Sequence, residues 1–346
     1  MRPRLTSTIN IIWFKHDLRV KDNPAFNAAC EAGSIVPVYI YDSRSSDKEP
    51  GGASKWWLHH SLTSLNKSLH GHLQIFHGDP KTLIPKLMAN FNANTIYWNR
   101  SYEPSQINRD TEIKQILKQS GLLAHSCNGS LLWEPMNILK KDGKAYKVFT
   151  PYYKNGCLSA QPPRFPLAPP ETVNYANVEH QGCSINDLNL LPAINWDSAF
   201  PKYWQPGEEG AADKLHTFIQ HAARQYYQLR DIPSANGTSR LSPHLHFGEL
   251  SPNQIWYAIK DRFGDSEDKS IETFLSELAW REFSYYLLYH FPTLPVSNFN
   301  PVFNKFPWRN DVKALDAWKT GKTEYRLLMR ECENYGKPDI CTIVYA

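Results

Sequence analysis

The sequence predicts an α/β domain followed by an all-α domain. Short apolar, β-rich runs alternate with helix-like stretches over the first third of the 346 residues, a proline-rich segment interrupts this pattern, and helical periodicity follows it. Strands and helices that alternate along a chain form a parallel sheet with helices on its faces. A chain of this length is long enough to bury two cores.

Four runs are expected to form strands: INIIWF at 9–14, IVPVYIYD at 35–42, LQIFHGD at 73–79 and NTIYWNR at 94–100. The stretches between them have the length and composition of helices: NPAFNAACEA at 23–32, ASKWWLHHSLTSLNKSLHG at 53–71 and PKTLIPKLMANFN at 80–92. No GxGxxG motif follows the first run, so the sheet does not indicate a nicotinamide site.

The proline-rich segment QPPRFPLAPPETVN predicts a connector that crosses the surface between the two domains. We expect the α/β domain at 1–135, the connector at 136–205 and the helical domain at 206–325. The helical pattern begins with GEEGAADKLHTFIQHAARQYYQLRD.

The composition limits the possible partners only weakly. The formal net charge is +4, which does not by itself indicate nucleic acid, whereas 11 Trp, 18 Tyr and 16 Phe could stack on planar rings. No apolar run is long enough to cross a membrane, and the N-terminus does not read as a signal peptide. Cys30, Cys127, Cys157 and Cys183 lack metal-ligand spacing, which predicts reduced thiols in a cytoplasmic protein without a structural metal.

The stretch NGTSRLSPHLHFGELSPNQIW at 236–256 contains a candidate phosphate site. Thr238 and Ser239 can cap a helix that begins here, and Arg240 adds a cation to the N–H groups of its first turn. A capped helix whose Arg240 pairs with a carboxylate explains the spacing equally well. His244 and His246 diverge on a helix, which argues against a metal site.

The stretch FLSELAWREFSYYLLYHF at 274–291 contains a second candidate. Helical spacing places Glu277, Trp280, Arg281 and Ser284 on one face, where they could line a pocket for a flat polar ligand. The alternative is a surface ion pair between Glu277 and Arg281. We favour the pocket, because the apolar residues around this face predict a buried helix in which an unpaired charge is costly.

Five motifs resemble the DNA photolyase and cryptochrome family: WFKHDLRVKDNPAF, WNRSYEP, YKVFTPYYKNGCL, GTSRLSPHLHFGELSP and ELAWREF. They occur in the family's order, and the resemblance extends from about Ile9 to Tyr325. The form LSPHLHFGELSP is more similar to bacterial class I cyclobutane pyrimidine dimer photolyases than to cryptochromes.

The resemblance implies a Rossmann-like antenna domain, an all-α domain that binds FAD, and a light-driven lyase that repairs cyclobutane pyrimidine dimers by electron transfer from reduced FAD. A cryptochrome-like blue-light photoreceptor and an inactive remnant of the family are the alternatives. The implied partner is damaged DNA with the thymine dimer flipped out, bound by a cytoplasmic monomer that does not associate with membranes.

The resemblance also implies roles for individual residues. Those that would contact FAD are Tyr226, Thr238, Ser239, Arg240, Leu241, Ser242 and, beside the flavin, Arg281. Glu277 and Trp280 would face the flipped dimer, and Trp308 would be the outermost tryptophan of the chain that photoreduces the flavin.

An antenna chromophore, either methenyltetrahydrofolate or a deazaflavin, is also implied by the resemblance. Ser105 and Gln106 stand where members that bind folate often have Asn-Glu, so this sequence departs from the folate pattern.

The last 21 residues, RLLMRECENYGKPDICTIVYA at 326–346, do not resemble the family's continuation. If one C is restored after the Tyr325 codon, synonymous codons for this tail read PIVDAGMRELWKTGYMHNRVR, which does resemble it. We therefore expect 326–346 to be out of frame, the helical domain to be incomplete, and this chain to be impaired or inactive; a genuinely divergent tail is the alternative.

Overall fold

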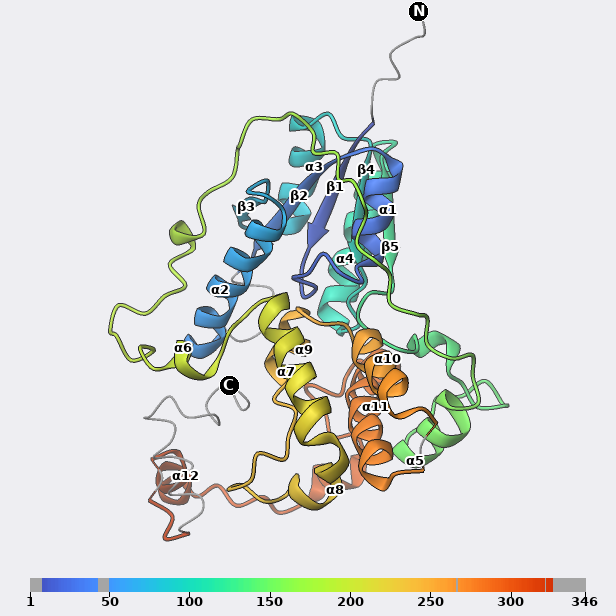
Figure 1. Cartoon of the computed structure of the whole chain (residues 1–346), viewed down its shortest axis with the longest axis vertical. Helices are drawn as coiled ribbons and strands as arrows, with labels where there is room; N and C mark the ends of the chain where they lie inside the picture. Colours follow the sequence, from blue (N-terminus) through green and yellow to red (C-terminus); the bar gives the residue numbers. More distant parts are fainter. Residues whose placement is uncertain (1–7, 43–49, 266, 321, 326–346) are drawn as a thin grey trace, which may run out of the picture.

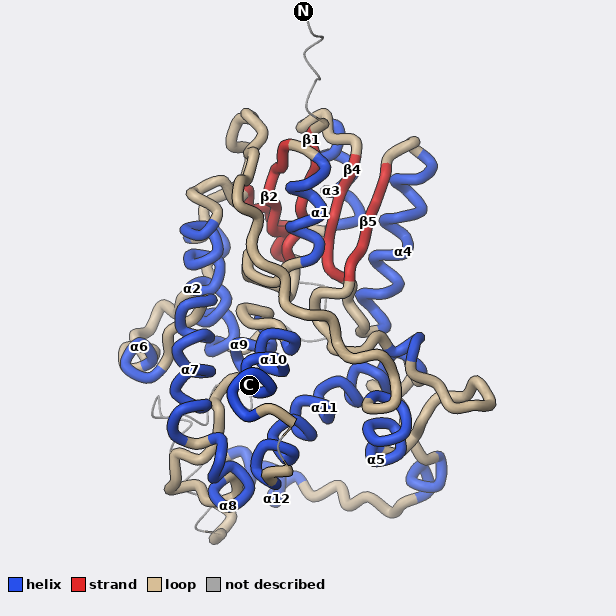
Figure 2. The backbone as a smooth tube through the Cα atoms, turned by 45° about the vertical axis from the view of Figure 1, so that its right-hand side comes forward, coloured by secondary structure: helices blue, strands red, loops and turns tan. Residues whose placement is uncertain are grey.

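The computed structural model describes residues 8–42, 50–265, 267–320 and 322–325. Figures 1 and 2 show a sheet with flanking helices in the upper part of the molecule and a group of helices below it. The tail at 326–346, which the sequence predicts to be out of frame, lies outside the described residues.

The upper part contains five parallel strands in the order β3-β2-β1-β4-β5. The strands are β1 (Ile9–Phe14), β2 (Ser34–Tyr41), β3 (Gln74–His77), β4 (Thr95–Asn99) and β5 (Leu123–Cys127). The strand order reverses between β1 and β4, so the connections leave these neighbours in opposite directions. In open sheets of this kind, ligands bind beyond the carboxyl ends of the strands at this point.

Each face of the sheet has its own core. The helices are α1 (Pro24–Ala32) and α2 (Gly52–Ser68) on one face, and α3 (Pro80–Asn90) and α4 (Pro104–Gln119) on the other. Side chains alternate along a strand, so Ile12 packs with α1 and α2 whereas Ile11 packs with α3 and α4. The predicted α/β fold of the first part is confirmed.

The sequence analysis missed α4 and β5. Helix α4 is strongly polar, and its buried apolar side chains come from only Ile113 and Leu117, so no apolar stripe marks it. Strand β5 lies at the edge of the sheet, and its sequence LAHSC contains no buried residue. Neither element therefore shows the apolar pattern on which the prediction depended.

The connector follows the α/β domain closely. From residue 158 to 199 the only helix is η3 (Asn186–Leu188), and Figure 1 shows this segment passing around the sheet to reach α6 (Phe200–Tyr203). The amide of Cys183 donates to the Ile75 carbonyl at 2.8 Å, which adds one antiparallel bridge to the edge strand β3. The connector is therefore held against the domain by backbone hydrogen bonds.

The lower part consists of helices around α11. They are η1 (Pro135–Asn137), α5 (Phe149–Pro151), the π-helix η2 (Tyr152–Cys157), α7 (Glu208–His221), η4 (Ala223–Gln225), α8 (Tyr226–Leu229), α9 (Ser242–Phe247), α10 (Pro252–Phe263), α11 (Lys269–His290), η5 (Pro301–Lys305) and α12 (Val312–Lys319). Asp268 caps α11 by accepting from the Ser270 amide at 2.8 Å. Part of the predicted connector, including Phe149 and Tyr152, belongs to this core. None of the helices described is both long and apolar enough to span a membrane.

The two parts meet in a polar junction. Trp57 Nε1 donates to Glu249 Oε1 at 2.9 Å, and Arg19 Nη1 donates to the Gly248 carbonyl at 2.8 Å. Gly248 has φ +68°, and a Cβ atom there would lie 2.0 Å from the His16 carbonyl oxygen. This close approach fixes α9 against the carboxyl end of β1 and requires glycine at the contact.

Candidate functional site

A cavity of about 470 Å³ lies in the helical domain. Its walls come from α8, the segment before α9, α9 itself, α10 and α11. The lining residues are Tyr226, Ser239, Leu241, Ser242, Leu245, His246, Ile255, Phe274, Glu277, Leu278, Arg281 and Tyr285. Six of the ten residues proposed from the sequence therefore lie around one cavity.

The segment before α9 is not the helix start that the sequence suggested. Helix α9 begins at Ser242 with Leu241 at the N-cap, and no side chain caps it, so the predicted caps by Thr238 and Ser239 are wrong. Arg240 has φ +54°, in the left-handed region, so the helical backbone begins only after this residue. Ser239 Oγ instead accepts from the Leu241 amide at 3.4 Å, so this hydroxyl stays in the turn beside the cavity.

Thr238 and Arg240 do not line the cavity. Thr238 is exposed, and Arg240 Nη2 donates to Asn236 Oδ1 at 2.7 Å rather than to a carboxylate. Within the part of the chain that the structure describes, Arg240 therefore does not form the ion pair that was considered for it.

Glu277 lies at the edge of the cavity. Its Oε1 accepts from Arg230 Nη1 at 2.5 Å, and the two side chains are 37% and 28% exposed. Arg281, one helical turn further along, bonds to Ser130 and Glu282, so the surface pair considered between Glu277 and Arg281 does not form. Burial raises the pKa of Tyr226, which also lines the cavity, and this keeps its hydroxyl neutral.

Trp280 lies beside the cavity and does not line it. Its ring stacks on Phe149 with centroids 3.8 Å apart, and 45% of the side chain remains exposed. Ser284, which the helical spacing also placed on this face, uses its hydroxyl to donate to the Trp280 carbonyl at 3.1 Å. The exposed indole face is therefore open to a planar ligand that approaches from solvent.

Trp308 follows η5 and is 71% exposed. Its ring contacts Phe306 at 4.6 Å, and it contributes nothing to the lining of the cavity. Its expected part in a tryptophan chain stays a prediction.

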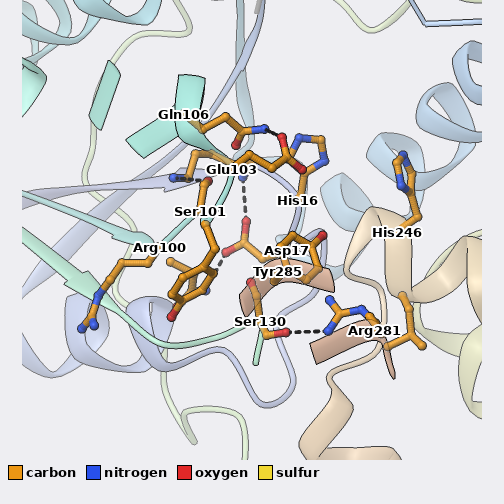
Figure 3. Close-up of a pocket in the computed structure, with 14 residues that line it drawn as sticks. His16, Asp17, Arg100, Ser101, Glu103, Gln106, Ser130, His246, Arg281 and Tyr285 are labelled. Atoms are coloured by element: carbon orange, nitrogen blue, oxygen red, sulfur yellow. Dashed lines mark hydrogen bonds between the residues drawn. The ribbon is translucent and has the colours of Figure 1, made fainter. Parts of the chain in front are cut away.

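A second, smaller cavity of about 30 Å³ lies beyond the carboxyl ends of β1 and β4 (Figure 3). It shares Leu245, His246, Arg281 and Tyr285 with the large cavity. The other lining residues are Lys15, His16, Asp17, Asn99, Arg100, Ser101, Tyr102, Glu103, Gln106 and Ser130. The two cavities therefore adjoin at the junction of the domains, at the point where the strand order reverses.

Lys15, which lines the small cavity, forms an ion pair. Lys15 Nζ donates to Asp110 Oδ2 at 2.6 Å, and the side chains are 7% and 11% exposed. Burial lowers the pKa of Lys15, while Asp110 opposes this change. Gln106 lines the cavity and donates to Glu103 Oε2 at 2.5 Å, whereas Ser105 is exposed.

Sequence reasoning missed several residues of the large cavity. Tyr285 lies four residues after Arg281 on α11, so extending the Glu277–Arg281 spacing by one step would have identified it. Leu278 is a core residue that also lines the cavity. Leu245 and His246 were missed as well, because the position of α9 among the other helices, which no local pattern indicates, brings them to the cavity.

Family comparisons match most of the chain. A model described as DNA photolyase matches residues 10–171, and one described as the FAD-binding domain of DNA photolyase matches residues 274–335. A deoxyribodipyrimidine photo-lyase of Agrobacterium fabrum is 39% identical over 94% of this chain and 69% of its own length. Cryptochrome-2 of Arabidopsis thaliana is 32% identical over 93% of this chain, which spans 56% of that protein.

Among solved structures, a bacterial class III photolyase from Agrobacterium tumefaciens is similar to this chain. The TM-score is 0.91 at 37% identity, over 99% of this chain and 72% of the other. The comparison supports the fold predicted for both domains. It does not confirm the class I assignment, because the similar structure is of class III.

Proposed function

Because the chain belongs to the DNA photolyase and cryptochrome family, we propose that it is a deoxyribodipyrimidine photo-lyase that repairs cyclobutane pyrimidine dimers in DNA with light. The observation that carries the proposal is the cavity of about 470 Å³, which gathers Tyr226, Ser239, Leu241, Ser242 and Arg281 and has Glu277 at its edge. A fold of this family without that constellation would support only ancestry.

The residues around the cavity fit FAD. Leu241, Ile255 and Leu278 give an apolar surface for planar rings, while the hydroxyls of Ser239 and Ser242 can donate to phosphate oxygens. Arg281 adds a cation to the same wall. FAD, when bound and reduced, would supply the light-driven electron that opens the dimer, and these side chains hold and orient it.

The lesion would contact Trp280 and Glu277. A dimer has weakened pairing, so it leaves the duplex at lower cost than an intact pair of bases. The exposed face of Trp280 offers a stacking surface for its rings, and Glu277 can accept hydrogen bonds from its N–H groups. Arg230 restrains the Glu277 carboxylate through the hydrogen bond between them.

A basic turn next to Trp280 can bind the DNA backbone. Residues 139–158 contain five lysines and one aspartate: Lys140, Lys141, Lys144, Lys147, Lys154 and Asp142. All five lysines are exposed. The Tyr286 hydroxyl fixes this turn to α11, since it donates to the Ile138 carbonyl at 2.8 Å and accepts from the Tyr146 amide at 2.9 Å. Lysines held in place next to the lesion site fit phosphate groups.

The small cavity does not fit the expected antenna chromophore. Its volume of about 30 Å³ has room for one or two water molecules, not for a pterin or a deazaflavin ring system. We therefore assign no antenna role to it.

Dimer loss in DNA tests the proposed function. The chain, loaded with FAD and reduced, is mixed with an oligonucleotide that carries one thymine dimer, and the dimer is counted after illumination and after darkness. We expect loss only in the light, and less of it with Trp280→Ala. The amount of loss also tests the expectation from the sequence that this chain is impaired. Light-dependent changes in the bound flavin without dimer loss would favour a photoreceptor, the alternative suggested by the similarity to cryptochrome-2.

A further inference from the structure

Glu282 is a buried carboxylate at the junction between the two domains. It lies on α11, one residue after Arg281, and is only 1% exposed. The mechanism proposed above does not use it, yet a buried carboxylate is costly unless partners compensate its charge.

The two oxygens of Glu282 have different partners. Oε2 accepts from the amides of Leu132 and Trp133 at 2.7 and 3.4 Å, in the segment after β5. Oε1 accepts from Arg281 Nη1 at 3.1 Å. One oxygen therefore fixes α11 to the segment that follows β5, and the other holds a guanidinium.

Arg281 is the residue that Glu282 Oε1 holds in place. Its Nη1 also donates to the Ser130 carbonyl at 2.9 Å, as Figure 3 shows, and its guanidinium lies 5.1 Å from the ring of Tyr285. Arg281 lines both cavities, so its position determines where a positive charge lies in the wall between them.

Burial raises the pKa of Glu282 to about 7, and Arg281 and the two backbone N–H groups oppose this rise. The titratable groups that face Glu282 from the packed elements are Tyr102, Tyr152, Cys157, Tyr285 and Arg281. Burial raises the pKa of the three tyrosines and of Cys157, so they stay neutral near pH 7. Arg281 is therefore the charged partner in this group.

We propose that Glu282 is a positioning residue that holds Arg281 in the wall of the large cavity while its carboxyl is ionised, and releases it when the carboxyl takes up a proton. The proton binds at Oε1, because Oε2 already accepts two N–H groups. An O–H at Oε1 no longer accepts from Arg281, so the ion pair is lost while the bonds to Leu132 and Trp133 remain.

A double-mutant cycle tests this coupling without any cofactor. Wild type, Glu282→Gln, Arg281→Gln and the double variant are unfolded in urea at pH 6 and pH 8. Glutamine keeps the shape of Glu282 and one carbonyl oxygen but cannot be ionised. We expect a coupling equivalent to about tenfold in the unfolding equilibrium at pH 8 and little at pH 6. Equal coupling at both pH values, or none at pH 8, would overturn the proposal.

A second measurement addresses the cavity and rests on the proposed function, because it needs bound FAD. The dissociation constant of FAD is measured by flavin fluorescence from pH 6 to 8.5, with Glu272→Gln, an exposed glutamate on the same helix, as the control. We expect wild type and the control to bind FAD about tenfold more weakly below pH 7, and Glu282→Gln to bind weakly throughout.

The two measurements separate failure of the inference from failure of the proposed function. If neither wild type nor any of the variants binds FAD at any pH, the cofactor assignment fails. The double-mutant cycle alone then decides the role of Glu282. If FAD binds to wild type and Glu282→Gln equally at every pH, Glu282 does not position Arg281 for the cofactor.

Discussion

The indole ring of Trp280 lies flat on the phenyl ring of Phe149, with centroids 3.8 Å apart and planes inclined by 12°. Phe149 is 9% exposed and belongs to the core, whereas Trp280 is 45% exposed. One face of the indole is thus fixed by the core, while the other remains available. Little side-chain conformational entropy is therefore lost when a ligand stacks on Trp280.

Trp280→Ala should weaken binding to dimer-containing DNA by about tenfold or more, since one base stack is worth about 1–3 kcal/mol. Phe149→Leu should weaken it less, because it only frees the indole. Phe165→Leu is the control, since Phe165 also stacks on an aromatic ring, that of Tyr257 at 4.1 Å, but away from the site. Fluorescence anisotropy gives the affinities. An equal loss for undamaged DNA would show that Trp280 does not read the lesion.

Trp57→Phe should destabilise the protein by about 1–3 kcal/mol more than Trp204→Phe. Both indoles are buried, but Trp57 Nε1 donates to the buried carboxylate of Glu249, whereas Trp204 Nε1 has no hydrogen-bond partner among the described residues. The same ring is shortened in both variants, so the difference isolates the hydrogen bond across the junction. Urea unfolding measures this difference in the free energy of unfolding. Equal destabilisation by both variants would mean that the hydrogen bond makes no net contribution to stability.

Stability should fall as pH rises from 4.5 to 7 by an amount that depends on Glu282. Its pKa is raised from 4.5 to about 7, so in this window the folded protein holds a proton that the unfolded chain has released. At about 1.4 kcal/mol per pKa unit, the contribution is about 3 kcal/mol. The free energy of unfolding is measured across this pH range. Its decrease with rising pH should disappear in Glu282→Gln and remain in Glu272→Gln.

Replacing Lys140, Lys144 and Lys147 with Gln should reduce the salt dependence of DNA binding. The slope of log K against log salt should fall by about 0.9 for each phosphate contact that is lost, for damaged and undamaged duplexes alike. The control replaces Lys67, Lys86 and Lys118, three exposed lysines of the α/β domain. The same change of slope in both triple variants would mean that general charge, and not the basic turn, determines binding.

The strands with continuous apolar runs could be predicted from the sequence, because β1, β2 and β4 are buried on both faces. Strand β5 could not, since an edge strand needs little apolar surface to pair. The pairing of β4 with β5 is a backbone interaction, and LAHSC carries little sign of it.

At the site, helical spacing correctly suggested that Glu277 and Arg281 face one cavity, since both lie on a single regular helix. The same spacing failed for Trp280, which a contact with Phe149, 131 residues earlier in the sequence, draws to one side. The start of α9 was wrong because the left-handed turn at Arg240 is a backbone conformation that nothing in TSRLS indicates. Local rules therefore located the elements that have a clear apolar pattern, and contacts distant in sequence decided which side chains meet.

The route of the connector also affects how the protein is made. Tyr146 and Tyr286 are hydrogen-bonded although 140 residues separate them, so the segment that contains Tyr146 leaves the ribosome well before its partner helix. At about 5–20 residues per second, the delay is roughly 7 to 28 s. During that time the α/β domain can fold and bind the connector, while Tyr146, Phe149 and Tyr152 still lack α11. These aromatic residues are where we expect a chaperone to bind the nascent chain.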